Sequence, residues 1–332
     1  MLLRLPFSKI NSIPISRKRC VLRKTNDKLF FSLLDYQNNK FMSGDIKTIF
    51  DFYSGFDNRM SLIEWMKSRP TGANYIREVE GDKDIVVIIP TADFNGKHSK
   101  TCRDEIFKGL HMIFVESGEI PDFYFNGARN VNVGLRKALE YKPNWIIVSG
   151  DDMYKIDQIS VLCDQLRKLN NKEYDIVFIT PSNYHSRDVY VGKMTKIYSL
   201  YLKLIKGNFG RDLYGLYKKF KVDYSAIPNR EIYSLAFKRV FHYIDFTDFF
   251  IFSSQFVKQN EEYMFDEIYI NNREDSDLSI RIKLENAKIA YANYRIGDFI
   301  GSSLGTGNNR MLTGVASEVY FNEKIDKILK IY

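Results

Sequence analysis

The sequence predicts an α/β fold in which helices flank a mostly parallel, doubly wound sheet. Between residues 84 and 180, four short apolar runs rich in β-branched residues alternate with segments of helical periodicity. This alternation is typical of parallel strands that are joined by crossover helices. The runs stay apolar at consecutive positions, which indicates strands that are buried on both faces.

The strands and helices can be placed in order along this stretch. The predicted strands are "DIVVIIP" at 84–90, "MIFVESG" at 112–118, "WIIVSGDDM" at 145–153 and "YDIVFIT" at 174–180. The predicted helices between them are "SKTCRDEIFKGL" at 99–110, "NGARNVNVGLRKALEYK" at 126–142 and "SVLCDQLRKL" at 160–169. In the second helix, Val131, Leu135 and Ala138 fall on one face, as a helix that packs on a sheet requires.

The composition limits the classes of partner and location that fit the chain, but it does not identify the function. The 332-residue chain has 49 Lys and Arg against 41 Asp and Glu, and its net charge of +8 favours anionic partners. Three widely spaced cysteines, Cys20, Cys102 and Cys163, show neither a disulfide framework nor a metal-binding motif. The start lacks a signal-peptide pattern, and no run approaches the ~18 apolar residues of a membrane span. We therefore expect a cytoplasmic protein that is at most peripheral to a membrane.

Polar residues stand where three of the predicted strands end. Thr91 follows the first strand, Glu116 closes the second, and Asp151 and Asp152 directly follow the third. Two adjacent carboxylates repel each other and do not belong in a core. Because ligands of such sheets bind outside the carboxyl ends of the strands, we expect these side chains to share one cleft. The alternative is a solvated turn in which the aspartates cap the next helix.

A second acidic cluster lies in "NREDSDLSIRI", residues 272–282. The apolar residues from Leu278 to Leu284 alternate as in a strand. We predict a helix instead, because Asp275 or Ser276 can cap its start and Asn286 can end it. Acidic residues at a helix start are also favoured by the helix dipole, which is the structural alternative to a catalytic role.

The order and spacing of five segments indicate a family resemblance: "VVIIPTADF", "FVESGE", "NGARNVNVGLRKAL", "WIIVSGDDM" and "FDEIYINNREDSDLSIRI". Together they resemble the inverting glycosyltransferases of family 2, and the resemblance covers roughly residues 84–300. The resemblance implies the GT-A fold, the Rossmann-like architecture of nucleotide-diphospho-sugar transferases. It also implies transfer of a sugar, with inversion, from a nucleoside-diphosphate donor (UDP favoured) to an acceptor hydroxyl.

The resemblance assigns catalytic and metal-binding roles to the two acidic clusters. Asp275 would be the general base that deprotonates the acceptor hydroxyl, with Glu274 as the alternative base and as an acceptor ligand. Asp152 would bind Mn²⁺ or Mg²⁺, which offsets the charge of the departing diphosphate, and Asp151 would face ribose or metal-bound water. The family's D-x-D pattern falls on Gly150-Asp151-Asp152, so its first aspartate is missing.

The same resemblance assigns other positions to the donor site. Thr91 and Asp93 lie in the first nucleotide-binding loop, and Glu116 matches an acidic residue that accepts a base N–H. Arg129 matches a position that contacts the nucleotide, although a helix-start arginine paired with a nearby acid fits equally well. Asp298 stands where relatives place a metal-binding histidine, before the Gly/Ser-rich "GSSLGTGNN", which we expect to form a lid.

The chain is expected to divide into four segments. Residues 1–80 form an N-terminal extension of unknown structure, 81–183 the nucleotide-sugar-binding half, and 184–245 a helical, aromatic and basic insert. Residues 246–332 form the acceptor-side half, with the catalytic base and a C-terminal helix. The Tyr/Leu/Lys pattern of the insert suits a surface that meets a membrane or a polymeric or lipid-linked acceptor, and it suits equally helices that pack on the core.

Three alternative functions can be weighed on the sequence. A nucleotidylyltransferase on a similar fold would need a Gly-rich, basic loop after the first strand, and "PTADFNGKHSK" is a poor version of one. We expect no nucleic-acid partner, because the basic charge is diffuse and the acidic clusters oppose phosphate binding. A degenerate transferase that binds a nucleotide sugar without turnover is harder to separate, given Gly150.

Overall fold

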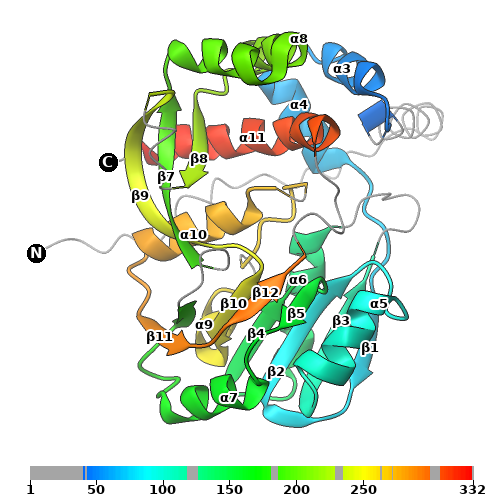
Figure 1. Cartoon of the computed structure of the whole chain (residues 1–332), viewed down its shortest axis with the longest axis vertical. Coiled ribbons are helices and arrows are strands. Elements are labelled where there is room, and N and C mark those ends of the chain that lie inside the picture. The colour runs from blue at the N-terminus through cyan, green and yellow to red at the C-terminus, as the bar shows by residue number, and fades with distance from the viewer. Residues whose placement is uncertain are drawn as a thin grey trace, which may run out of the picture.

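The computed structural model has two parts, a large sheet flanked by helices and a mainly helical part that packs against it (Figure 1). It describes residues 40–41, 43–117, 126–180, 186–228, 235–261, 264–270, 272–299 and 307–330. Residues 1–39 of the N-terminal extension and most of the predicted lid, residues 300–306, lie outside the described residues.

In the described part of the chain, the large sheet has seven strands in the order β1-β3-β2-β4-β10-β6-β11. Their bounds are β1 Tyr75–Val79, β2 Asp82–Thr91, β3 Leu110–Glu116, β4 Trp145–Ser149, β6 Ile176–Thr180, β10 Phe249–Ser253 and β11 Ile289–Asn293. The neighbours β3, β2 and β4 run parallel, as do β6 and β11, whereas β1 and β10 run antiparallel to the strands beside them. The α/β class and the four predicted strands are confirmed, and the sheet is mixed.

Helices cover both faces of this sheet, as the alternation of elements predicts. One face carries α5 (Lys97–Thr101), the π-helical turn η1 (Cys102–Ile106) and α7 (Ile159–Lys168). The other carries α6 (Gly127–Leu139), α9 (Ser254–Gln259) and α10 (Glu274–Leu284). Successive strand residues enter different cores, since Val87 faces the first group of helices and Val86 the second. The strands can therefore be apolar at every position.

The second part combines segments that are far apart in the sequence. It contains α3 (Ile46–Ser54), α4 (Arg59–Ser68), α8 (Ile197–Lys219), α11 (Asn308–Ile328) and an antiparallel sheet of β8 (Tyr224–Pro228), β7 (Ser186–Met194) and β9 (Phe237–Phe246). One apolar core joins them, in which Tyr53, Trp65, Phe220 and Phe321 are buried. Helices α3 and α4 of the extension thus pack with the insert and the C-terminal helix in one unit, whereas its last strand, β1, belongs to the large sheet.

The insert at 184–245 is not only helical, in contrast to the prediction. It contains the long helix α8, but strands β7, β8 and β9 flank this helix. In β7, Val189 and Val191 are buried, whereas Asp188 before them and Tyr190 between them are more exposed. This alternation has the period of two that a half-buried strand shows. It was missed in the sequence because the lysines and tyrosines of the segment recur at intervals that resemble those of a helix.

Helix α6 packs on β2 with no space for a side chain at Gly134. A Cβ atom there would lie 2.4 Å from Cγ2 of Ile88, far inside van der Waals contact. We expect Gly134→Ala to lower the free energy of unfolding by about 1–3 kcal/mol, because the helix or the strand must shift. Urea unfolding of the full chain measures this change.

Gly215 of α8 provides a matched control for this substitution. No atom lies within 4 Å of the position that its Cβ would take. Gly215→Ala should therefore gain helix propensity, up to about 1 kcal/mol, without an obstacle. If Gly134→Ala were as stable as wild type while the control behaved as expected, the packing of α6 on β2 would be contradicted.

Candidate functional site

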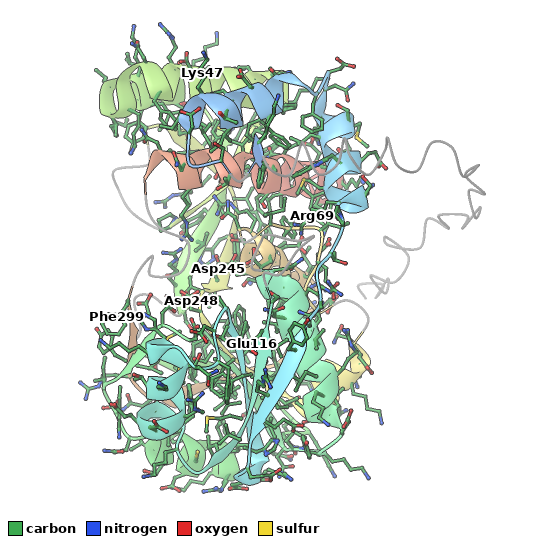
Figure 2. All side chains as sticks on the ribbon, turned by 90° about the vertical axis from the view of Figure 1, so that its right-hand side faces the viewer. Lys47, Arg69, Glu116, Asp245, Asp248 and Phe299 are labelled. Carbon is green, nitrogen blue, oxygen red and sulfur yellow. The ribbon has the colours of Figure 1, made fainter. Side chains whose placement is uncertain are left out.

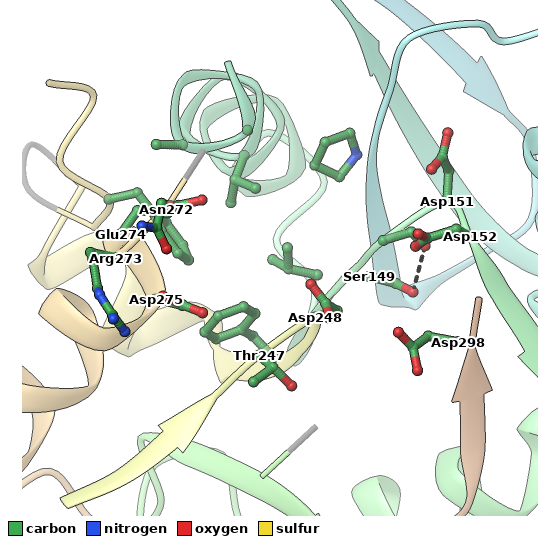
Figure 3. A pocket seen from close by; sticks show the side chains of 18 of the residues that line it. Ser149, Asp151, Asp152, Thr247, Asp248, Asn272, Arg273, Glu274, Asp275 and Asp298 are labelled. Atoms are coloured by element: carbon green, nitrogen blue, oxygen red, sulfur yellow. Dashed lines mark hydrogen bonds between the residues drawn. The ribbon is translucent and has the colours of Figure 1, made fainter. Parts of the chain in front are cut away.

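A cavity of about 250 Å³ opens where the two parts of the molecule meet (Figure 3). Its walls come from the ends of β2 and β4, the start of β10 and the N-termini of α6, α10 and α11. Six carboxylates line it: Asp151, Asp152, Asp248, Glu274, Asp275 and Asp298. Arg273 and Arg310 add positive charge to the lining. The two acidic clusters, which are far apart in the sequence, therefore share one pocket.

The antiparallel strand β10 brings Asp248 to this pocket. Strand β10 starts opposite the end of β4, and the Gly150 N–H donates to the Asp248 carbonyl oxygen over 3.0 Å. Figure 3 shows Asp248 between Asp275 on one side and Asp152 and Asp298 on the other. An antiparallel strand thus presents its leading residue at the edge where the parallel strands end.

Gly150 leaves space for these carboxylates. A Cβ atom at this position would lie 2.9 Å from Oδ1 of Asp152 and 3.9 Å from Cβ of Asp248. An aspartate here, as in the D-x-D pattern, would crowd Asp152 and would lie in ordinary contact with Asp248. Asp248 therefore stands beside the place from which the missing first aspartate would project.

A small second sheet brings Asp298 next to Asp152. It pairs β5 (Met153–Lys155) with β12 (Ile296–Asp298), so that Asp298 lies opposite Met153, the residue after Asp152. The Phe299 N–H also donates to the Asp152 carbonyl oxygen over 2.9 Å. The backbone thus holds together two aspartates that the resemblance assigns to one metal ion.

The start of α10 is fixed by contacts with the second part of the molecule. Arg273, the residue before the helix, is left-handed with φ of 74°, a conformation that costs energy in a non-glycine residue. Its side chain donates to Glu318 Oε1 over 2.7 Å and to Ser225 Oγ over 2.9 Å. Glu274 and Asp275 thereby occupy the first helical turn, where the helix dipole favours negative charge.

Burial and like charges shift the protonation of the cluster. Burial, followed by the charges of Asp275, Asp152 and Asp298, raises the pKa of Asp248 to about 7. Burial and the charge of Asp275 raise the pKa of Glu274 to about 8. A cation that entered the pocket would relieve this repulsion and favour the ionised carboxylates.

Glu274 and Asp275 differ in the groups that stabilise their charge. Burial also raises the pKa of Asp275, but the Ser276 N–H, Arg273 and Arg187 oppose this shift, and the Ser276 N–H lies 2.7 Å from Asp275 Oδ1. Oε2 of Glu274 is buried and has no hydrogen-bond partner among the described residues. Glu274 therefore holds a proton more tightly than an ordinary glutamate, whereas the donors beside Asp275 favour its carboxylate.

Asp245, near the end of β9, supports the first turns of α10. Figure 2 shows it close to Asp248, between the two parts of the molecule. Its side chain is 2% exposed, and the hydroxyls of Ser276 and Ser279 lie 3.0 and 2.9 Å from its carboxyl oxygens. Burial, followed by the charge of Asp275, raises the pKa of Asp245 well above that of an ordinary aspartate.

Thr91 and Asp93 do not line the pocket, although their neighbours Pro90 and Ala92 do. Thr91 is buried, and its Oγ1 donates to Asp151 Oδ2 over 2.7 Å. Asp93 is exposed and accepts backbone N–H bonds within its own loop. Thr91 thus positions an aspartate of the pocket, and contact of either residue with a nucleotide stays a prediction.

Glu116 and Arg129 also lie outside the pocket lining. Glu116 accepts the Phe94 N–H over 2.8 Å and the Arg77 Nε–H over 3.2 Å. Arg129 donates to the carbonyl oxygen of Gly72, so a carbonyl rather than an acid is its partner. Both side chains join neighbouring loops, and their assignment to the nucleotide stays a prediction.

Asp248 and Asp245 were not predicted as site residues, although a signal for Asp248 is present. It directly precedes the apolar run "FFIFS", which mirrors the order of "WIIVSGDD". When a strand runs in the opposite direction, an acid before it reaches the same sheet edge as an acid after its neighbour. Asp245 lies inside a strand of mixed polarity, where no such signal exists.

The raised pKa of Asp245 makes a prediction about stability and pH. The folded chain binds the Asp245 proton more tightly than the unfolded chain does. The contribution of this carboxyl to the free energy of unfolding is therefore fully present below the ordinary pKa of 3.8 and decreases as the pH rises through the raised pKa. Asp245→Asn keeps the shape without the charge. We expect its stability relative to wild type to increase from about pH 5 to about pH 8 in chemical unfolding.

The control for this experiment is Asp245→Leu, which leaves two serine hydroxyls without their partner. We expect it to lower the free energy of unfolding by about 1–3 kcal/mol. A constant difference between Asp245→Asn and wild type across this pH range would mean that the Asp245 carboxyl titrates normally.

No model of a known protein family matches this chain, and no curated protein matches its sequence at a significant level. The family resemblance therefore stays a hypothesis. The function must be argued from the geometry and charge of the pocket.

Proposed function

We propose that this chain is an inverting glycosyltransferase that moves a sugar from a nucleoside-diphosphate donor to an acceptor hydroxyl. The main support is that one cavity carries Asp152 and Asp298 on one side and Asp275 on the other, with Asp248 between them (Figure 3). Inverting displacement needs stabilisation of the leaving group on one face of the sugar and a base on the opposite face. The α/β sheet is compatible with the GT-A fold.

Asp275 is suited to be the general base. As the acceptor oxygen forms its bond to C1 of the sugar, the bond between C1 and the diphosphate oxygen breaks. The hydroxyl proton passes to the Asp275 carboxylate, and the nucleoside diphosphate leaves with the bonding electrons. Glu274, whose pKa burial raises to about 8, is suited in its protonated form to donate a hydrogen bond to the acceptor.

The donor set of the opposite wall fits a hard divalent cation, Mn²⁺ or Mg²⁺. Asp152, Asp248 and Asp298 offer the carboxylate oxygens that these ions prefer. Among the described residues, no group of three His, Cys, Asp or Glu side chains is placed to hold a metal ion by itself, so the proposed ion would need further ligands from the donor. When bound, the cation would offset the charge that develops on the leaving group.

The N-terminus of α6 adds a second feature that suits a diphosphate. Gly127 and Ala128, the first residues of this 13-residue helix, line the same cavity. The positive end of a helix favours phosphate oxygens. We place the donor between α6 and the aspartates and expect the polymeric or lipid-linked acceptor to approach past α10.

Replacement of the base tests this proposal. We expect Asp275→Asn to lower the release of UDP from a panel of UDP-sugars by about 10²–10⁴-fold, measured with Mn²⁺ and with and without acceptor sugars. Donor binding should persist, because the opposite wall is unchanged. Glu274→Gln should have a smaller effect.

Asp212→Asn, which removes an exposed carboxylate of α8, is the control and should turn over at the wild-type rate. Equal turnover of Asp275→Asn and wild type would exclude Asp275 as the base. UDP-sugar binding without turnover in wild type, across the acceptor panel, would instead identify a degenerate transferase.

A swap of two residues tests whether Asp248 replaces the missing aspartate of the D-x-D pattern. Asp248→Gly should weaken Mn²⁺-dependent UDP binding, and Gly150→Asp alone should crowd the pocket. In the double variant, the new carboxylate occupies the vacated space. We expect a coupling of about 1 kcal/mol or more in a double-mutant cycle measured by calorimetry. Strictly additive effects would show that the two positions do not share a role.

A further inference from the structure

One continuous stretch of the second part carries basic residues without any acidic residue. Residues 189–211 contain Lys193, Lys196, Lys203, Lys206 and Arg211 and no Asp or Glu. Most of this stretch forms the end of β7 and the first half of α8. It concentrates positive charge on one element of the described structure.

The same half-helix exposes large apolar side chains. The exposed fractions are 52% for Ile197, 55% for Leu200, 77% for Leu204 and 54% for Ile205. Leu235, with 73% exposed, lies beside them, because its carbonyl oxygen accepts the Thr195 hydroxyl at the start of the helix. Single exposed apolar residues are common, but a group on one element indicates an interaction surface.

A break in α8 separates this half from the buried half. Gly207 has φ of 61° and ψ of −131°, a conformation that favours glycine. After the break, Leu213, Leu216 and Tyr217 are buried in the core of the second part. Before it, Tyr198 and Leu202 suffice to attach the helix, so the opposite face is turned to solvent at one end of the molecule (Figure 2).

We propose that this face binds the surface of an anionic membrane. We call it the α8 surface and define it by Lys196, Ile197, Leu200, Lys203, Leu204, Ile205 and Lys206. Its aliphatic side chains would enter the interface between headgroups and acyl chains, while its lysines would contact anionic headgroups. No helix in the described ranges is long and apolar enough to cross a membrane, so binding would be peripheral.

The charge of the α8 surface favours a membrane over a second copy of this chain. In a symmetric dimer the same patch would face itself, and its lysines would meet lysines without a compensating acid. An anionic lipid surface is complementary to all of them at once. The residues that line the carboxylate cavity lie on other elements, so this surface can be tested whether or not the chain transfers a sugar.

Co-sedimentation of the full chain with vesicles tests the α8 surface. The probes are vesicles of phosphatidylcholine alone and vesicles with about one third phosphatidylglycerol. We expect binding to the anionic vesicles, weakened by salt, and about tenfold weaker binding for Leu200→Gln/Leu204→Gln. Lys203→Glu/Lys206→Glu should weaken binding at least tenfold, since each lysine near the surface contributes roughly fivefold.

Matched changes outside the surface control for fold and total charge. Ile156→Gln/Val161→Gln replaces apolar residues of similar exposure, 47% and 44%, and Lys168→Glu/Lys172→Glu reverses two exposed lysines. Both should bind within about twofold of wild type, since each change lies away from the headgroups.

Three results would overturn the proposal. The first is no binding of wild type to anionic vesicles, and the second is equal binding to both vesicle types. The third is wild-type binding by either α8 variant. A wild-type dimer in light scattering that Leu200→Gln/Leu204→Gln converts to monomer, without vesicle binding, would identify the surface as a contact between copies of the chain.

Discussion

The repulsion among carboxylates in one pocket is the constraint on which the rest of this structure depends. Like charges at close range in a partly buried site raise one another's pKa and destabilise the folded state. The chain offsets this in separate ways: the raised pKa of Glu274, a hydrogen bond from the Thr91 hydroxyl to Asp151, and the helix dipole at Asp275. The remaining repulsion among the other aspartates is the source of their affinity for a cation in the proposed function.

The large sheet could be predicted from the sequence because burial on both faces leaves a simple signal. The direction of β10 could not, since an apolar run reads the same in either orientation. The second part was harder still, because its core is assembled from residues such as Trp65, Phe220 and Phe321. Such contacts join distant segments of the chain, whereas the periodicity of a sequence describes only one segment at a time.

Helix α10 shows how one pattern can have two causes. Its alternating apolar residues resemble a strand, yet Leu278 and Ile282 enter the core beneath the sheet, while Ile280 enters that of the second part. Two stripes on opposite sides of a helix give the same alternation. The end at Asn286, with φ of 54°, was predicted correctly, but Arg273 rather than Asp275 or Ser276 holds the N-cap.

That the two acidic clusters share one cavity could be predicted from the sequence, whereas the contacts around them could not. Asp152 and Asp275 meet because strand ends and helix starts converge at one edge, which is a rule of the architecture. The partners of Glu116 and Arg129 depend on loop positions that no local pattern specifies. Helix α10 contributes Leu278 and Ile282 to one core and Ile280 to the other. A movement that separated the two parts would therefore expose apolar side chains of this helix to water, at a cost of roughly 1.5–3 kcal/mol for each one.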